Sequence, residues 1–117
     1  MNPLPFEFEP SKAFDIAGSI EYVSGSIVKK SIIRKITGNI SAVAVDAGEK
    51  VEENVSPFQV FIQIIDGRAE VIIDDHPTLL ITGQSIIVPA HSRNSINAYS
   101  RFKMILTVIK SGYENVS

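Results

Sequence analysis

The side chains that most often catalyse reactions or bind metal ions are sparse in this sequence. The 117-residue chain has no cysteine and only two histidines, His76 and His91. The lack of cysteine excludes thiolate nucleophiles, thiolate metal sites and disulfides, and two isolated histidines are too few ligands for a metal site. The acidic residues Glu49, Glu52 and Glu53 gather in an expected loop, where we interpret them as solvated. The sequence also has no phosphate-binding loop and no Ser–His–Asp order.

Basic residues do not indicate nucleic-acid binding. Eleven Lys and Arg are outnumbered by thirteen Asp and Glu, and the pI is about 5.6, whereas a general nucleic-acid binder carries a basic footprint. On a strand, Lys30 and Arg34 would face one side while Lys29 and Lys35 face the other. This division favours charges that protect an exposed edge strand from aggregation over a phosphate-tracking stripe.

Composition and turn spacing predict an all-β domain. The chain contains 18 Ile and 11 Val, and β-branched side chains favour strands. Turn residues at short intervals predict about nine antiparallel strands in a sandwich or barrel. The clearest of these strands cover residues 27–36, 40–46, 59–65, 68–73, 78–81, 85–88, 94–99 and 102–109. Asp66-Gly67 between two apolar runs predicts a hairpin turn, because such turns need φ > 0 at both central residues.

One domain with two short ends accounts for the chain. Residues 1–25 form an extended, proline-containing arm and a first strand or short helix, for which Ser11 is the candidate N-cap. Residues 26–110 form the barrel and residues 111–117 a C-terminal tail. No apolar run reaches 18 residues and no signal-peptide pattern is present, so we expect a soluble, cytoplasmic protein without a membrane span.

Two expected strands are apolar on both faces. Residues 59–65 and 102–109 carry apolar side chains at both even and odd positions, whereas a small antiparallel sheet with one face in water alternates apolar and polar residues. The surplus of apolar side chains predicts that a second surface covers the other face of these strands. We expect that cover to be another copy of the chain in a homodimer, and the alternative is that the arm at residues 1–12 encloses the strand.

Two segments resemble the conserved motifs of the cupin superfamily. The family's first motif is Gly, five residues, His-x-His, three or four residues, Glu and a later Gly, and it is similar to Gly48–Gly67. The second motif is Gly, five residues, Pro-x-Gly, two residues and His, and it is similar to Gly83–Asn94. The resemblance covers about residues 26 to 110. It implies an antiparallel jelly-roll β-barrel, in agreement with the strand pattern.

The resemblance places neutral residues where cupins bind a metal. Position by position, the two His of the first motif fall on Asn54 and Ser56, the Glu on Gln59 and the His of the second motif on Asn94. Divalent ions favour imidazole, thiolate or carboxylate ligands, so we expect the cupin fold without a metal or other cofactor. These residues, with Gln63 one layer beyond Gln59, are instead candidates for binding a small polar ligand in the barrel. The alternative is that they bond only to each other and to trapped water.

His91 takes the place of the Gly in Pro-x-Gly, where the family loop favours φ > 0. Histidine enters that region more readily than most residues, so the turn explains its presence. The alternative is a general base at the barrel mouth. His76 follows Asp74-Asp75 in an expected turn, and we interpret it as solvated.

Three functions from different classes are compatible with these residues. The favoured one is a metal-free cupin that binds or senses a small molecule. The second is a metal-independent enzyme of the isomerase or epimerase type, which needs a positioned base that only His91 offers. The third is a degenerate paralogue that acts through protein interaction. The neutral residues at the ligand positions favour the first and the third, and the sequence identifies no ligand.

Overall fold

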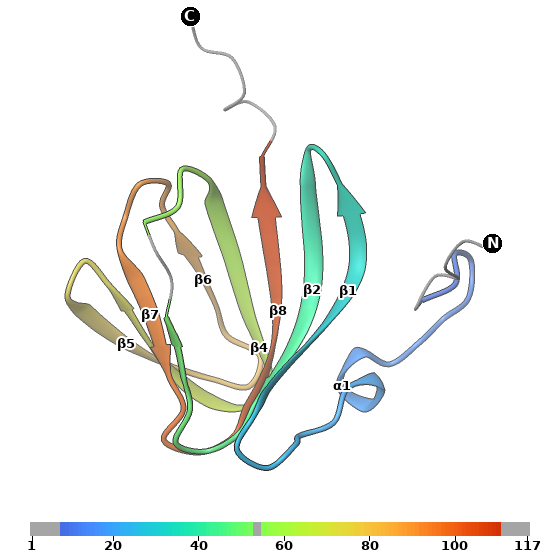
Figure 1. Cartoon of the computed structure of the whole chain (residues 1–117), viewed down its shortest axis with the longest axis horizontal. Helices are drawn as coiled ribbons and strands as arrows, with labels where there is room; N and C mark the ends of the chain where they lie inside the picture. Colours follow the sequence, from blue (N-terminus) through green and yellow to red (C-terminus); the bar gives the residue numbers. More distant parts are fainter. Residues whose placement is uncertain (1–7, 53–54, 111–117) are drawn as a thin grey trace, which may run out of the picture.

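The chain folds into strands that curl around a common interior, as Figure 1 shows. This computed structural model describes residues 8–52 and 55–110. All strand pairings are antiparallel, so the predicted all-β antiparallel fold is confirmed. The elements are α1 (Ile16–Ser19), β1 (Ile27–Lys35), β2 (Gly38–Val45), β3 (Lys50–Glu52), β4 (Gln59–Ile73), β5 (His76–Ile81), β6 (Ser85–Val88), β7 (Asn94–Asn97) and β8 (Phe102–Ile109).

The long strand β4 belongs to two sheets. Its first half pairs with β8 and β6, and β8 continues to β2 and β1; its second half pairs with β7 and β5, and β7 continues to β3. The register shifts between Ile64 and Asp66, and Gly67 has φ 83°. Such a β-bulge bends a strand and increases its twist. The prediction of a hairpin turn at Asp66-Gly67 is therefore wrong, because these residues bend one continuous strand.

Gly67 is required at this bend for two reasons. Its φ of 83° lies in the left-handed region that favours glycine. A Cβ at this position would also collide with the Arg101 carbonyl oxygen and lie 3.1 Å from Phe102 Cα. The hairpin itself comes later, where Asp74 and Asp75, with φ 47° and 70°, connect β4 to β5. A two-residue turn of this kind needs positive φ at both positions.

Two other boundaries differ from expectation. The short helix begins at Ile16 with Asp15 at its N-cap position, so Ser11 is not the cap. The expected loop around Glu49–Glu53 contains β3, whose three residues pair with β7. A strand this short carries no alternating pattern, and its pairing with β7 defines it.

Apolar side chains fill the space between the two sheets. Along the first half of β4, Ile62 and Ile64 are at most 1% exposed, and half-buried Val60 packs against the same core. Phe102 and Met104 of β8 are fully buried beside them. The even-numbered positions of this part of β4 therefore face the interior.

The N-terminal segment covers part of the outer surface. Ile20, 1% exposed, packs on Ala42 and Ala44 of β2, with Ile16, Tyr22, Val28 and Ile32 around them. The Lys30 ammonium donates to the Ser19 carbonyl at 2.7 Å, and the Lys103 ammonium donates to the Ala17 carbonyl at 2.6 Å. Within the part of the arm that the structure describes, the residues around α1 are thus the ones that cover a face of the sheet.

Candidate functional site

Two adjoining pockets lie where the β4–β5 turn meets the β6–β7 loop. The first has a volume of about 220 Å³ and the second about 260 Å³. Asp75 and Arg93 line both pockets, so the two share a wall. The remaining residues of the first pocket are Lys50, Glu52, Ile72, Asn94 and Ser95, and those of the second are Val55, Asp74 and His91.

Backbone hydrogen bonds hold these loops in place. The Arg93 amide donates to Asp74 Oδ1 at 3.0 Å, and the Asp74 amide donates to the Arg93 carbonyl at 2.8 Å. The His91 amide donates to the Ser56 carbonyl at 2.6 Å. His91 has φ 68°, which confirms the positive φ expected at this turn.

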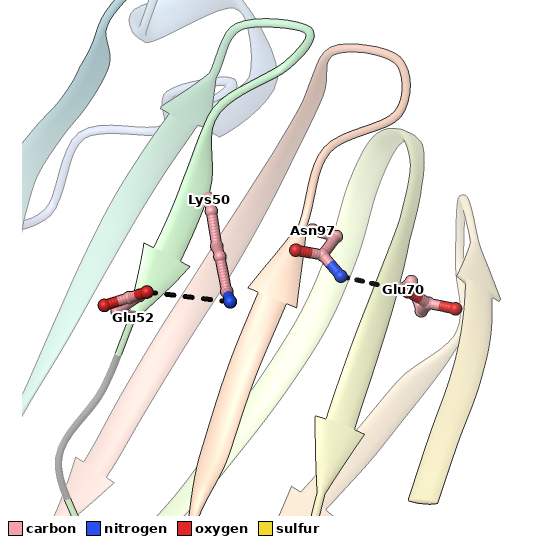
Figure 2. Close-up of polar contacts among 4 residues, drawn as sticks. All are labelled: Lys50, Glu52, Glu70 and Asn97. Carbon is pink, nitrogen blue, oxygen red and sulfur yellow. Dashed lines mark hydrogen bonds and ion pairs between the residues drawn. The ribbon is translucent and has the colours of Figure 1, made fainter. Parts of the chain in front are cut away.

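Asn94 is the sequence-predicted site residue that the structure places inside the barrel. It begins β7, pairs with Ile73 and is 6% exposed, on the same face as buried Ile96. Its side-chain amide makes no hydrogen bond within the residues that the structure describes. Asn97, three positions later, faces outward instead and donates from its amide to Glu70 Oε1 at 3.0 Å (Figure 2). A buried amide without a partner loses its hydrogen bonds to water and gains none in the protein.

Gln59 and Gln63 do not belong to the site. Gln59 is exposed and Gln63 half-buried, and both lie on the outer face, opposite Ile109 and Ile105 of β8. Because side chains alternate between faces, a shift of one residue moves a side chain to the other side of the sheet. The first cupin motif allows three or four residues before its Glu, and three residues after Ser56 place that position on inward-facing Val60. The prediction that the two glutamines line the barrel is therefore wrong.

Ser56 lies near the second pocket and fixes its own turn. Its hydroxyl oxygen accepts from the Phe58 amide at 3.0 Å and donates to the Phe58 carbonyl at 3.4 Å. Its carbonyl holds the His91 loop. Asn54 lies outside the described residues.

The donor set does not fit the metal that the cupin family carries. Ser56, Val60 and Asn94 offer a hydroxyl that is already bonded, an alkyl group and a neutral amide. Across residues 8–52 and 55–110, no three His, Cys, Asp or Glu side chains come together as a possible ion site. Divalent cations need charged or imidazole ligands to offset desolvation.

The first pocket carries balanced charge. Lys50 and Arg93 are cationic, while Glu52 and Asp75 are anionic. The Lys50 ammonium lies 3.6 Å from Glu52 Oε2, as Figure 2 shows. Sequence reasoning missed these four residues, because β3 was expected to be a loop and the turn at Asp75 was read only as a turn.

A second polar group lies on the outer face beside this pocket. The Glu70 carboxylate accepts from the Asn97 amide at 3.0 Å and from the Tyr99 hydroxyl at 2.8 Å. These two bonds hold the pKa of Glu70 below its ordinary value, and the bond from Asn97 has the larger effect. The bond to Glu70 in turn raises the pKa of the Tyr99 hydroxyl. The group fixes the outward side of β7, whose inward side carries Asn94.

Comparison with solved structures identifies the fold. The chain is similar to a conserved protein of unknown function from Streptococcus pyogenes, at 23% identity and a TM-score of 0.84 over 93% of this chain and 97% of that one. It is also similar to a cupin superfamily protein from Desulfitobacterium hafniense, at 23% identity and a TM-score of 0.82 over 88% and 94% of the two chains. A cupin 2 conserved barrel domain protein from Leptotrichia buccalis shares 26% identity and a TM-score of 0.80, over 83% of this chain and 47% of that longer one. The chain therefore has the cupin fold, which confirms the resemblance carried by its two motifs.

Two further comparisons complete this result. No protein-family model and no curated protein matches the sequence. Among the described residues, no helix has the length and apolar character needed to cross a membrane.

Proposed function

We propose that this protein is a small-molecule binding or sensing module that takes a neutral polar ligand beside Asn94 without a divalent metal. The observation that carries the proposal is the Asn94 side-chain amide, which is 6% exposed, faces the barrel interior and has no hydrogen-bond partner in the described structure. A ligand that bonds to this amide would recover the cost of its burial.

The surroundings of the Asn94 side chain limit the chemistry of the ligand. An amide offers two donors and an acceptor, and the inward face that it shares carries the apolar side chains of Val71, Ile73 and Ile96. The first pocket does not extend this surface, because Glu52, Ile72 and Ser95 lie side by side on the opposite, outer face. These features support a small, neutral ligand with both donor and acceptor groups.

An acid–base enzyme receives less support. A general base needs a group that orients it and a position within hydrogen-bond reach of the substrate. His91 lines the second pocket, but no side chain in the described part of the chain hydrogen-bonds its imidazole. Its backbone conformation already accounts for its residue type. The cytoplasmic location expected from the sequence stays a prediction.

Thermal unfolding with three ring compounds of similar size tests the proposal. We expect neutral 2-pyrrolidone to raise the melting temperature in buffer with EDTA, and pyrrolidinium and cyclopentanecarboxylate to leave it unchanged. At ten times Kd, mass action stabilises the folded state by about 1.4 kcal/mol. Asn94→Leu should abolish the shift, and Asn97→Leu should retain it. Equal shifts with all three compounds, or a shift that survives Asn94→Leu, would contradict the proposal.

A further inference from the structure

A β-bulge in β1 brings Lys29 and Arg34 to the same face of the first sheet. The register of β1 against β2 shifts between Ser31 and Ile33. One extra residue in a strand reverses which of the later positions face inward. Lys29 before the bulge and Arg34 after it therefore share a face. The prediction that these two side chains lie on opposite faces is wrong, because it assumed an uninterrupted alternation.

The face that Lys29 and Arg34 share is the inner one. Lys29 pairs with Val43 of β2, which belongs to the core between the two sheets, and Arg34 pairs with Asn39, four residues before Val43. Cross-strand partners share a face. Both basic residues are exposed, and Figure 1 shows β1 at one end of this sheet. The segment around α1 packs on Ala42, on the outer face, so it leaves the inner face of β1 open.

No acidic residue of the described strands faces inward to neutralise these two cations. The acidic residues of these strands are Glu52, Asp66 and Glu70, and all three face outward. Within residues 8–52 and 55–110, Lys29 and Arg34 make no ion pair and no side-chain hydrogen bond. Two positive charges on a face without negative ones attract an anion.

Two hydroxyl groups lie between the basic residues. Ser31 pairs with Ser41, and both face inward, midway between Lys29 and Arg34. The β2 partners of the two basic residues are four positions apart, which is about 14 Å at the usual rise of a strand, so both long side chains can reach toward the serine pair. Ser41 is 3% exposed, and its hydroxyl has no hydrogen-bond partner among the described residues. A buried hydroxyl in this state gains stability when a ligand supplies the missing bond.

We propose that Lys29, Ser31, Arg34 and Ser41, here called the inner basic site, bind the phosphoryl dianion of a phosphate monoester. The planar guanidinium of arginine matches two phosphate oxygens, the lysine ammonium adds a point charge, and the hydroxyls donate hydrogen bonds. Half-buried Leu106 pairs with Ser41 and faces inward beside it, which gives the organic group of the ester an apolar surface. A monocarboxylate has one charge to share between two cations and binds more weakly.

Protection of an edge strand explains the outward basic residues of β1 better than the inward ones. Charges on an edge strand discourage pairing with another chain. Lys35 is exposed on the outer face, opposite Gly38, and Lys30 on the same face is bonded to the segment around α1. An edge needs neither an acid-free inner face nor unpartnered hydroxyls between its cations, whereas a site for an anion needs both. The inner basic site belongs to the first sheet and Asn94 to the second, so this proposal does not depend on the proposed function.

Titration of the protein into phenyl phosphate, followed by phosphorus-31 NMR at pH 8, tests the proposal. The second pKa of such an ester is about 6, so the probe is a dianion. We expect a saturable shift with the wild type and about tenfold weaker binding by Arg34→Gln and by Lys29→Gln, because each removes one charge-assisted contact. Lys35→Gln is the matched control, since it removes the same charge from the next position of β1 on the outer face. It should retain the wild-type affinity.

Two competing anions define the class of ligand. Benzoate carries the same ring with one charge and should displace phenyl phosphate at least tenfold less well than unlabelled ester does. Inorganic phosphate lacks the ring and should also compete less well, because it makes no contact with Leu106; tighter binding of inorganic phosphate would overturn the assignment to an ester. No saturable shift with the wild type, or equal losses in Arg34→Gln and Lys35→Gln, would overturn the site itself. In the first case the inward cations protect only the edge of β1, and in the second the attraction comes from the charge of the whole strand.

Discussion

Replacing Asn94 with leucine should stabilise the protein while removing its ligand site. Asn94 is 6% exposed, faces the barrel interior and has no hydrogen-bond partner for its amide among the described residues. Leucine has the same branching at Cγ and brings no polar atoms. Asn94→Leu therefore removes an unsatisfied buried group without a large change of shape.

The size of the effect follows from the cost of that burial. An unsatisfied buried donor or acceptor costs about 1–3 kcal/mol, and bound water recovers part of this cost. We therefore expect a gain of about 1–2 kcal/mol in the free energy of unfolding. For a domain of this size, such a gain raises the melting temperature by about 4–8 °C.

Urea and thermal unfolding, followed by circular dichroism, measure the change. Asn97→Leu is the matched control, because it alters the same residue type on the same strand but removes an existing bond to Glu70. This control should leave stability unchanged or lower it. If Asn94→Leu instead lowered the free energy of unfolding by about 1 kcal/mol or more, the amide would be well bonded in the folded protein, and the reasoning would fail.

Three further predictions test other parts of the structure. Gly67→Ala should cost about 2–4 kcal/mol, measured by urea unfolding, because alanine is strained at φ 83° and its Cβ meets the backbone of the neighbouring strand; a neutral result would contradict the bulge geometry. Burial and then the hydrogen bond to Asp66 raise the pKa of Tyr22 above its ordinary value of 10.0, so the stability it contributes is present below pH 10 and lost as the pH rises further. Tyr22→Phe should reduce this alkaline loss in unfolding measured from pH 8 to 12, and an identical pH profile would argue against the bond. Val60→Glu should cost about 2–4 kcal/mol of folding stability, because it places a charge inside the barrel. Gln59→Glu on the outer face should change stability by less than about 0.5 kcal/mol. A larger loss for Gln59→Glu than for Val60→Glu would show that Gln59, and not Val60, faces the interior.

Local sequence signals predicted most strands well. The bounds expected for residues 85–88 and 102–109 match β6 and β8, because each run of apolar and β-branched residues ends at a turn residue or a proline. The second motif also placed Asn94 correctly. Its spacing from Gly83 through Pro89 contains no variable gap, so no shift in register was possible.

Other features depend on pairing between distant strands. A glycine with positive φ after Asp66 suits a hairpin turn and a β-bulge equally, and only the pairing of β4 with both β8 and β5 decides between them. The first motif allows three or four residues before its Glu position, but only two separate Ser56 from Gln59. This error of one residue placed Gln59 in the interior instead of on the outer face. Strand β3 exists through its pairing with β7, which no pattern within three residues can reveal.

The most direct test of a metal-independent ligand site is the nitrogen-15 NMR signal of the Asn94 side-chain amide, followed during titration with 2-pyrrolidone in the presence of EDTA. We predict a saturable shift of this signal and none of the Asn97 side-chain amide, which already donates to Glu70 on the outer face. The matched cation, pyrrolidinium, should leave both signals in place. An Asn94 signal that stays fixed through the titration, or that moves only after a divalent metal is added, would contradict the account.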